Sequence, residues 1–147
     1  MILNRQRRVR IPVQKLEAFF SRARRMLRLS ANALTVCFVT DSEMARWNRL
    51  YRGKNRPTDV LSFPVHAASS RRGSGWRNGR ASGYLGDIAI APAIALRNAR
   101  LLGRSFDDEM KILILHGILH LMGYDHETDT GQMNRREQRL RRALGLA

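Results

Sequence analysis

Residues 107–126 read DDEMKILILHGILHLMGYDH, and this stretch is the centre of the predicted fold. Its apolar side chains recur nearly all round a helix rather than along one stripe, which is typical of a buried helix. Asp107 and Asp108 offer an N-cap and acidic residues for the first turn. The sequence therefore predicts a buried helix that ends near Met122, where Gly123 can take the left-handed conformation that reverses the chain.

Shorter segments with strand and helix patterns flank this stretch. Runs rich in β-branched residues predict strands at 34–40, 59–65 and 84–91. Apolar spacing predicts a helix at 14–29, and a capping box at Thr40 to Glu43 predicts the start of a second helix. A third helix is predicted from Pro92 to about Leu102. A fourth is predicted at 133–144, with Asp129 or Thr130 as its cap. We expect a mixed α/β or α+β fold, one domain over residues 1–147, with a mixed sheet of about four strands and about five helices.

Length and composition limit the class of protein. The 147 residues, 44% of them hydrophobic, suit one domain with a modest core. The lone Cys37 excludes an internal disulfide framework and every Cys-rich zinc module, and it favours a reducing compartment. The longest apolar run, 112–122, is too short to cross a bilayer. We therefore expect a cytoplasmic protein with no membrane partner, in which His or carboxylate ligands hold any metal.

The chain is strongly basic. It carries 27 Lys and Arg against 12 Asp and Glu, a formal net charge of +15, and 24 of the basic residues are Arg. Guanidinium groups bind phosphate oxygens in pairs, so this excess favours a polyanionic partner, RNA first among them. A compositional bias toward Arg explains the count equally well. Even then the folded protein is expected to bind nucleic acid non-specifically, and salt is expected to weaken that binding.

A flexible basic loop is predicted at 67–83. Residues 69–83, SSRRGSGWRNGRASG, hold four Ser, four Arg, four Gly and no acid. This composition is typical of a solvated insertion. The alternative is a flap that contacts RNA, with Trp76 stacking on a base.

Three of the four His residues lie close together, at His116, His120 and His126. Positions four apart share one face of a helix, so His116 and His120 can direct their imidazoles at one point. The bend at Gly123 can return His126 to the same point. Three neutral imidazoles with an open fourth position form the ligand set of a catalytic zinc ion. The pattern predicts one Zn²⁺ per chain.

Two families share parts of this pattern. The spacing of the three His resembles the extended zinc motif of metzincin proteases, but Gly117 stands where those proteases hold their general-base Glu. The full string HGILHLMGYDH instead resembles the signature of the YbeY family, single-domain endoribonucleases that act in ribosomal RNA maturation. Similar blocks occur at 48–64 (NRLYRGKNRPTDVLSFP), at 85–88 (LGDI), and at Met133 and Glu137 before the closing Leu-Gly. The similarity runs from about residue 34 to 146, and segment 67–83 is longer and more basic than usual there.

The resemblance implies a zinc-dependent, single-strand-specific endoribonuclease in 16S ribosomal RNA maturation and ribosome biogenesis. It implies His116, His120 and His126 as ligands, and Arg52 as a functional residue in the cleft. That allocation is chemically sensible, because a guanidinium and a divalent cation together stabilise the charge that develops on phosphoryl oxygens. The implied partners are ribosomal RNA of the small subunit and the small-subunit particle.

Several roles stay open at this point. The group that attacks phosphorus is open: it is either a hydroxide on the metal or the ribose 2′-hydroxyl after that hydroxide has taken its proton. Asp125 and Glu127 are other candidate bases, but orienting a ligand His or capping a helix explains each of them equally well. Asp59 and Asp87 are candidates to orient a ligand His. Ser62 has no nearby partner to make it a nucleophile and is expected to face solvent. Two other functions remain, an RNA-binding ribosome assembly factor with a structural zinc and a metzincin-like metalloprotease.

Overall fold

The structure is a computed structural model that describes residues 1–54, 56–65, 76–77, 80–81, 83–124 and 130–146. Within these residues the helices are α1 Val13–Met26, α2 Asp41–Arg52, α3 Pro92–Leu102, α4 Phe106–Leu121 and α5 Gln132–Ala143. The strands are β1 Ile2–Asn4, β2 Leu34–Phe38, β3 Val60–Pro64, β4 Trp76–Arg77, β5 Arg80–Ala81 and β6 Gly86–Ile90. The predicted α+β fold with a mixed sheet and five helices is confirmed.

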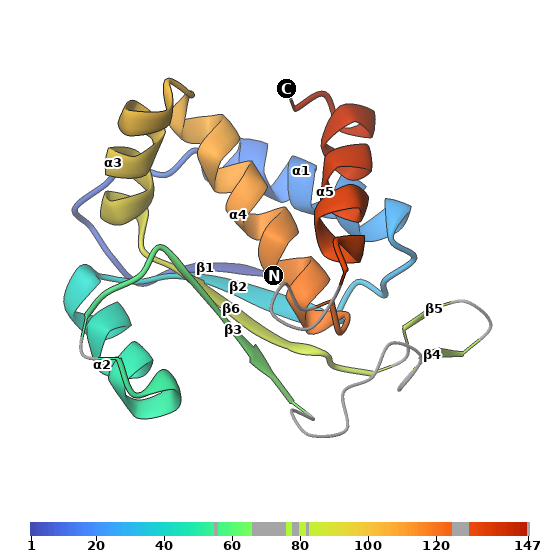
Figure 1. The fold of residues 1–147 in the computed structure, drawn as a ribbon, viewed down its shortest axis with the longest axis horizontal. Helices are drawn as coiled ribbons and strands as arrows, with labels where there is room; N and C mark the ends of the chain where they lie inside the picture. Colours follow the sequence, from blue (N-terminus) through green and yellow to red (C-terminus); the bar gives the residue numbers. More distant parts are fainter. Residues whose placement is uncertain (55, 66–75, 78–79, 82, 125–129, 147) are drawn as a thin grey trace.

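The main sheet has the strand order β1-β2-β6-β3. β1, β2 and β6 are parallel, whereas β3 runs antiparallel to β6 along one edge. Figure 1 shows α1, α3, α4 and α5 on one side of this sheet and α2 on the other. Because side chains alternate along a strand, Val36 and Ile88 enter the larger core and their neighbours Cys37 and Ala89 enter a smaller core beside α2. Burial raises the pKa of the Cys37 thiol.

Helix α4 lies at the centre of the larger core. It contacts α1, α3, α5, β3 and β6, and its apolar side chains are buried around most of its circumference, as predicted. Gly117 allows it to approach the sheet closely. A Cβ atom on Gly117 would lie 2.8 Å from Cγ2 and 2.9 Å from Cδ1 of Ile88, which is fully buried on β6. The helix that carries the histidine pair is therefore fixed against the middle of the sheet.

The helix caps agree only in part with the predictions. Thr40 Oγ1 accepts a hydrogen bond from the Glu43 N–H, as the capping box requires. For α4 the predicted cap at Asp107 or Asp108 is wrong, because Ser105 Oγ accepts from the Asp108 N–H and both aspartates lie in the first turn. The aspartates still face the positive end of the helix dipole.

The cap of α5 is also different from the prediction. Gly131, with φ of 97°, occupies the N-cap in place of Thr130, and the alternative Asp129 lies outside the described residues. Glycine adopts this left-handed conformation without the steric cost that a side chain brings.

Two small features were not predicted. β1 pairs with β2 although its three residues precede an Arg-rich segment. β4 and β5 form a two-residue antiparallel pair within the predicted loop, whose other residues, apart from Gly83, lie outside the described chain. In the described part of the chain, every helix is too short or too polar to cross a membrane.

Candidate functional site

The histidine pair occupies successive turns of α4, as the spacing predicted. The Nε2 atoms of His116 and His120 are 3.1 Å apart, and the ring centroids are 4.6 Å apart. Two imidazoles on one tetrahedral zinc, with bonds of about 2.0–2.1 Å, place their nitrogen atoms roughly 3.4 Å apart. The pair therefore has the donor type that zinc binds, at a separation about 0.3 Å shorter than that of two ligands on one zinc ion.

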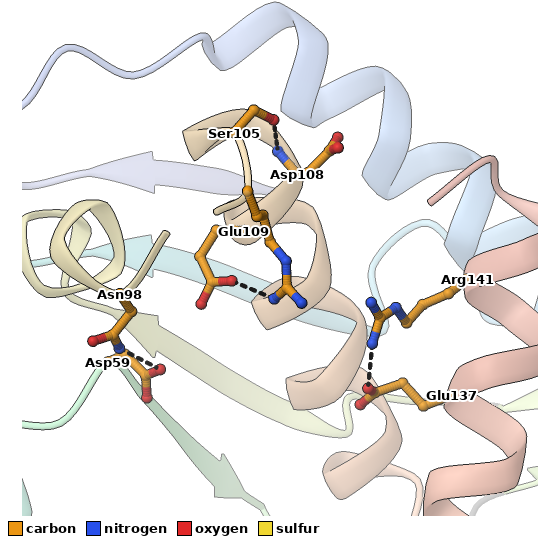
Figure 2. A network of polar contacts seen from close by, with 8 residues as sticks. Asp59, Asn98, Ser105, Asp108, Glu109, Glu137 and Arg141 are labelled. Atoms are coloured by element: carbon orange, nitrogen blue, oxygen red, sulfur yellow. Dashed lines mark hydrogen bonds and ion pairs between the residues drawn. The ribbon is translucent and has the colours of Figure 1, made fainter. Parts of the chain in front are cut away.

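A buried carboxylate contacts the second ring nitrogen of His116. Nδ1 of His116 lies 2.9 Å from Oε1 of Glu137, which α5 contributes and which is only 8% exposed. The other carboxylate oxygen, Oε2, lies 3.7 Å from Nη1 of Arg141 one turn further along α5 (Figure 2). Glu137 therefore joins the histidine pair to the C-terminal helix.

Glu137 belongs to the C-terminal block that resembles the YbeY family, but the sequence did not predict what its side chain does. The available signal was its position, since Met133, Glu137 and Leu140 follow helical spacing and all three are buried. A carboxylate on an apolar stripe is costly to bury without partners, so its presence there points to a specific contact.

The third predicted ligand lies outside the described residues, as do its neighbours Asp125 and Glu127. The described residues contain no cluster of three or more His, Cys, Asp and Glu side chains able to hold a metal. The left-handed conformation predicted at Gly123 is confirmed. Gly123 has φ of 97°, and the Tyr124 N–H donates to the Leu119 carbonyl, which closes the end of α4.

A cavity of about 390 Å³ opens in front of the histidine pair. Its lining includes His116, His120, Asp59, Ser62 and Arg52. Arg52 is the last residue of α2, whose end is set by Gly53 in the left-handed conformation with φ of 69°. The structure thus brings Arg52 and two predicted ligands to the same cavity, from elements on opposite sides of the sheet.

A second cavity of about 550 Å³ adjoins the first and shares Arg52, Thr58, Asp59 and Leu61 with it. Lys54 and Arg56 also line it, so three cationic side chains border the two cavities. Asn48 fixes the segment after α2, because its buried Nδ2 donates to the Arg56 carbonyl at 2.7 Å. This bond positions the cationic segment beside the histidine cavity.

The two aspartates suggested as partners for a ligand His lie in different places. Asp59 lines the histidine cavity, where its carboxylate accepts a hydrogen bond from Asn98 Nδ2 at 3.3 Å (Figure 2). It also accepts a hydrogen bond from Thr58 Oγ1 at 3.4 Å. For Asp87 the suggestion is wrong. Strand alternation turns its side chain to the α2 side of the sheet, where it accepts a hydrogen bond from the Tyr84 hydroxyl. Burial and this hydrogen bond raise the pKa of Tyr84.

Ser62 was expected to face solvent, and this is wrong. It is half-buried on β3, and its Oγ donates to the Gly117 carbonyl at 3.3 Å, so it ties the edge strand to α4. His66, set aside as an ordinary polar residue, lies outside the described part of the chain.

The α+β fold, with paired imidazoles on a buried central helix and cationic side chains at the border of their cavity, defines a class of small proteins with one main sheet and a histidine-lined, cationic pocket. A sequence profile described as endoribonuclease YbeY matches residues 1–145. The chain belongs to the endoribonuclease YbeY family, which confirms the resemblance found in the sequence.

Individual relatives agree with this placement. The chain is 38% identical to the Endoribonuclease YbeY of Koribacter versatilis over 146 residues, which cover 99% of this chain and 86% of that protein. It is 38% identical to the protein of the same name from Aquifex aeolicus over 126 residues, 86% of this chain and 77% of that one. A Thermotoga maritima protein of known solution structure has a TM-score of 0.63 at 25% identity and is similar over 98% of this chain and 89% of its own.

Proposed function

We propose that this chain is a metal-dependent endoribonuclease that cleaves single-stranded regions of RNA and acts in 16S ribosomal RNA maturation in the cytoplasm. The name of its family supports cleavage of RNA. The single observation that carries the proposal is the meeting of two converging imidazoles, His116 and His120, with the Arg52 guanidinium in one cavity. The small ribosomal subunit particle is the partner that this role requires.

The proposed metal is one Zn²⁺ ion, with His116, His120 and His126 as its ligands. Neutral imidazole nitrogens are ordinary zinc ligands, and the 3.1 Å separation of the two described Nε2 atoms fits that use. When bound, such an ion supplies Lewis acidity, which lowers the pKa of water and offsets negative charge on phosphoryl oxygens.

The chain's own side chains bind and orient the RNA. The Arg52 guanidinium donates to phosphoryl oxygens, and these charge-assisted bonds strengthen as negative charge develops during cleavage. Lys54 and Arg56, in the adjoining cavity, bind the next phosphates along the strand. Asp125 and Glu127 are the candidates for a general base among the side chains, and hydroxide supplied by the metal is the alternative to both.

Two features favour this function over the alternatives. A structural zinc site is closed by protein ligands, whereas the histidine pair here borders an open cavity of about 390 Å³. This observation disfavours an assembly factor with a purely structural zinc. Residue 117, where a metzincin places its catalytic Glu, faces Ile88 in the core rather than the cavity, which disfavours a protease.

The test is cleavage of an RNA with single-stranded ends by the purified protein, beside denatured protein as a rival substrate. His120→Ala is expected to reduce RNA cleavage to background together with the bound zinc, measured by mass spectrometry of metals. Arg52→Glu is expected to lower the cleavage rate by about 100-fold or more, since it removes a charge-stabilising donor.

Arg49→Glu is the matched control, because Arg49 is exposed on the same helix and is not among the residues that line either cavity. It makes the same charge change and is expected to keep most of the activity. Undiminished RNA cleavage by His120→Ala would assign the activity to a contaminant. Metal and RNA binding without turnover would favour the assembly factor, and proteolysis independent of Arg52 would favour the protease.

A further inference from the structure

We propose that Glu137 is a positioning residue that selects the tautomer of His116 and holds its ring toward the cavity. This inference rests on the proposed metal site and assigns a role to a residue outside the ligand set. Its starting observation is the 2.9 Å contact between Glu137 Oε1 and His116 Nδ1. The contact joins α5 to α4 behind the histidine pair.

The tautomer of His116 that the contact favours follows from the two atoms that meet. A carboxylate only accepts hydrogen bonds, so Nδ1 of His116 must carry the proton when it faces Glu137. The Nε2 atom then carries a lone pair and faces the cavity, 3.1 Å from Nε2 of His120. The opposite tautomer would place a lone pair against the carboxylate and a proton where a cation is to bind. Glu137 thus favours the tautomer that is able to ligate metal.

Burial argues against a merely structural role for Glu137. The side chain lies on the stripe of α5 that also buries Met133 and Leu140, where an apolar residue would pack without loss of hydration. Its carboxylate is instead placed between His116 and Arg141, with one oxygen directed at each. The Arg141 guanidinium lies 3.7 Å from Oε2, so the two oxygens of the carboxylate have different partners.

Glu109 offers a matched control within the same molecule. It is also buried, with 3% exposure, and pairs with Arg104 at 2.7 Å (Figure 2). It lies near the start of α4, two turns before His116, and does not line the histidine cavity. Glu109→Gln therefore makes the same change in a buried ion pair away from the histidines.

The experiment uses the full chain with Glu137→Gln, Glu137→Ala and Glu109→Gln. Zinc affinity is measured by competition with a chelator, and Co²⁺ is added in place of zinc to record the visible absorption of the site. Glu137→Ala is expected to weaken zinc binding about 10- to 100-fold and to change the Co²⁺ spectrum. Glu137→Gln retains an oxygen acceptor for Nδ1 and is expected to fall between Ala and wild type. Glu109→Gln is expected to lower the melting temperature while its zinc affinity stays within about twofold of wild type.

Failure of the positioning role and failure of the proposed function give different results in this experiment. If wild type binds zinc and His120→Ala does not, but both Glu137 variants bind zinc as wild type does, the positioning role is overturned and the proposed function stands. If wild type binds neither Zn²⁺ nor Co²⁺, the proposed function is overturned and this role falls with it. Melting curves of the metal-free variants separate lost affinity from lost folding, and if Glu137→Ala does not fold, Glu137→Gln decides the question.

Discussion

Gly117 determines how closely α4 approaches the sheet, and its replacement is a sensitive test of the packing. Gly117→Ala would place a Cβ atom 2.8–3.0 Å from three carbon atoms of Ile88, which is fully buried, so one of the two side chains or the helix would have to shift. We expect this overpacking to lower the free energy of unfolding by about 1–3 kcal/mol, although alanine is the better helix former. Denaturation by urea measures the change.

The control for this prediction is the double variant Gly117→Ala with Ile88→Ala. Ile88→Ala removes all three carbon atoms that would meet the new Cβ, so the two changes together are expected to cost less than the sum of the single costs. Strictly additive costs would show that the close contact between residues 117 and 88 is not the cause.

For single residues, the sequence predicts correctly those side chains whose spacing alone makes them point in the same direction. His116 and His120 lie four apart on a helix, and their rings do converge. The role predicted for Asp87 was wrong, because the sequence of one strand does not say which of its two faces meets α4. Glu137 was given no role because its contact with His116 joins two residues that lie 21 positions apart on different helices, and no local pattern encodes such a contact.

Among the elements, α4 has the widest contacts, and its N-terminal cap offers a local test. Ser105 Oγ accepts from the Asp108 N–H at 3.1 Å, so Ser105→Ala leaves that N–H without its capping partner. We expect a loss of about 1 kcal/mol in the free energy of unfolding, measured by chemical denaturation. Because α4 packs against three helices and two strands, the loss is expected in the global transition.

Ser42→Ala is the control for the cap. Ser42 is exposed in the first turn of α2, outside the N-cap position, where alanine is at least as good a helix former. It is expected to be neutral or slightly stabilising. Equal destabilisation by both serine variants would contradict the capping role of Ser105.

Elements with strong end signals were predicted well. Pro92 opens α3, and Gly103, in the left-handed conformation with φ of 66°, ends it after Leu102 as expected. The start of α4 was misplaced because Ser105 and the two aspartates after Phe106 are all acceptable caps. β1 has three residues and, among the strands that the structure describes, pairs with β2 alone, so tertiary contact rather than local propensity makes it a strand.

For the molecule as a whole, the net charge of +15 predicts a strong salt dependence of RNA binding. If about six phosphates are contacted, the affinity for single-stranded RNA is expected to fall roughly 300-fold between about 50 and 200 mM salt, because bound counterions are released. Fluorescence anisotropy with a labelled RNA measures the affinity at each salt concentration.

Zinc binding by the same protein is the internal control for that experiment. The proposed ligands act over bond distances rather than through the net charge of the protein, so zinc affinity is expected to depend on salt much less steeply than RNA affinity does. An RNA affinity that stays constant over this range would mean that the Arg-rich surface does not carry the binding. The excess of arginine would then be a matter of composition alone.

The contact between residue 117 and Ile88 also restricts how this scaffold can diverge. A glutamate codon at position 117 would complete the helical motif of a zinc peptidase, yet its side chain would be directed into the sheet and would collide with Ile88. A lineage would have to shrink residue 88 or slide the helix before that codon could be accepted. A single Gly117→Glu substitution is therefore not expected to convert this chain into a protease.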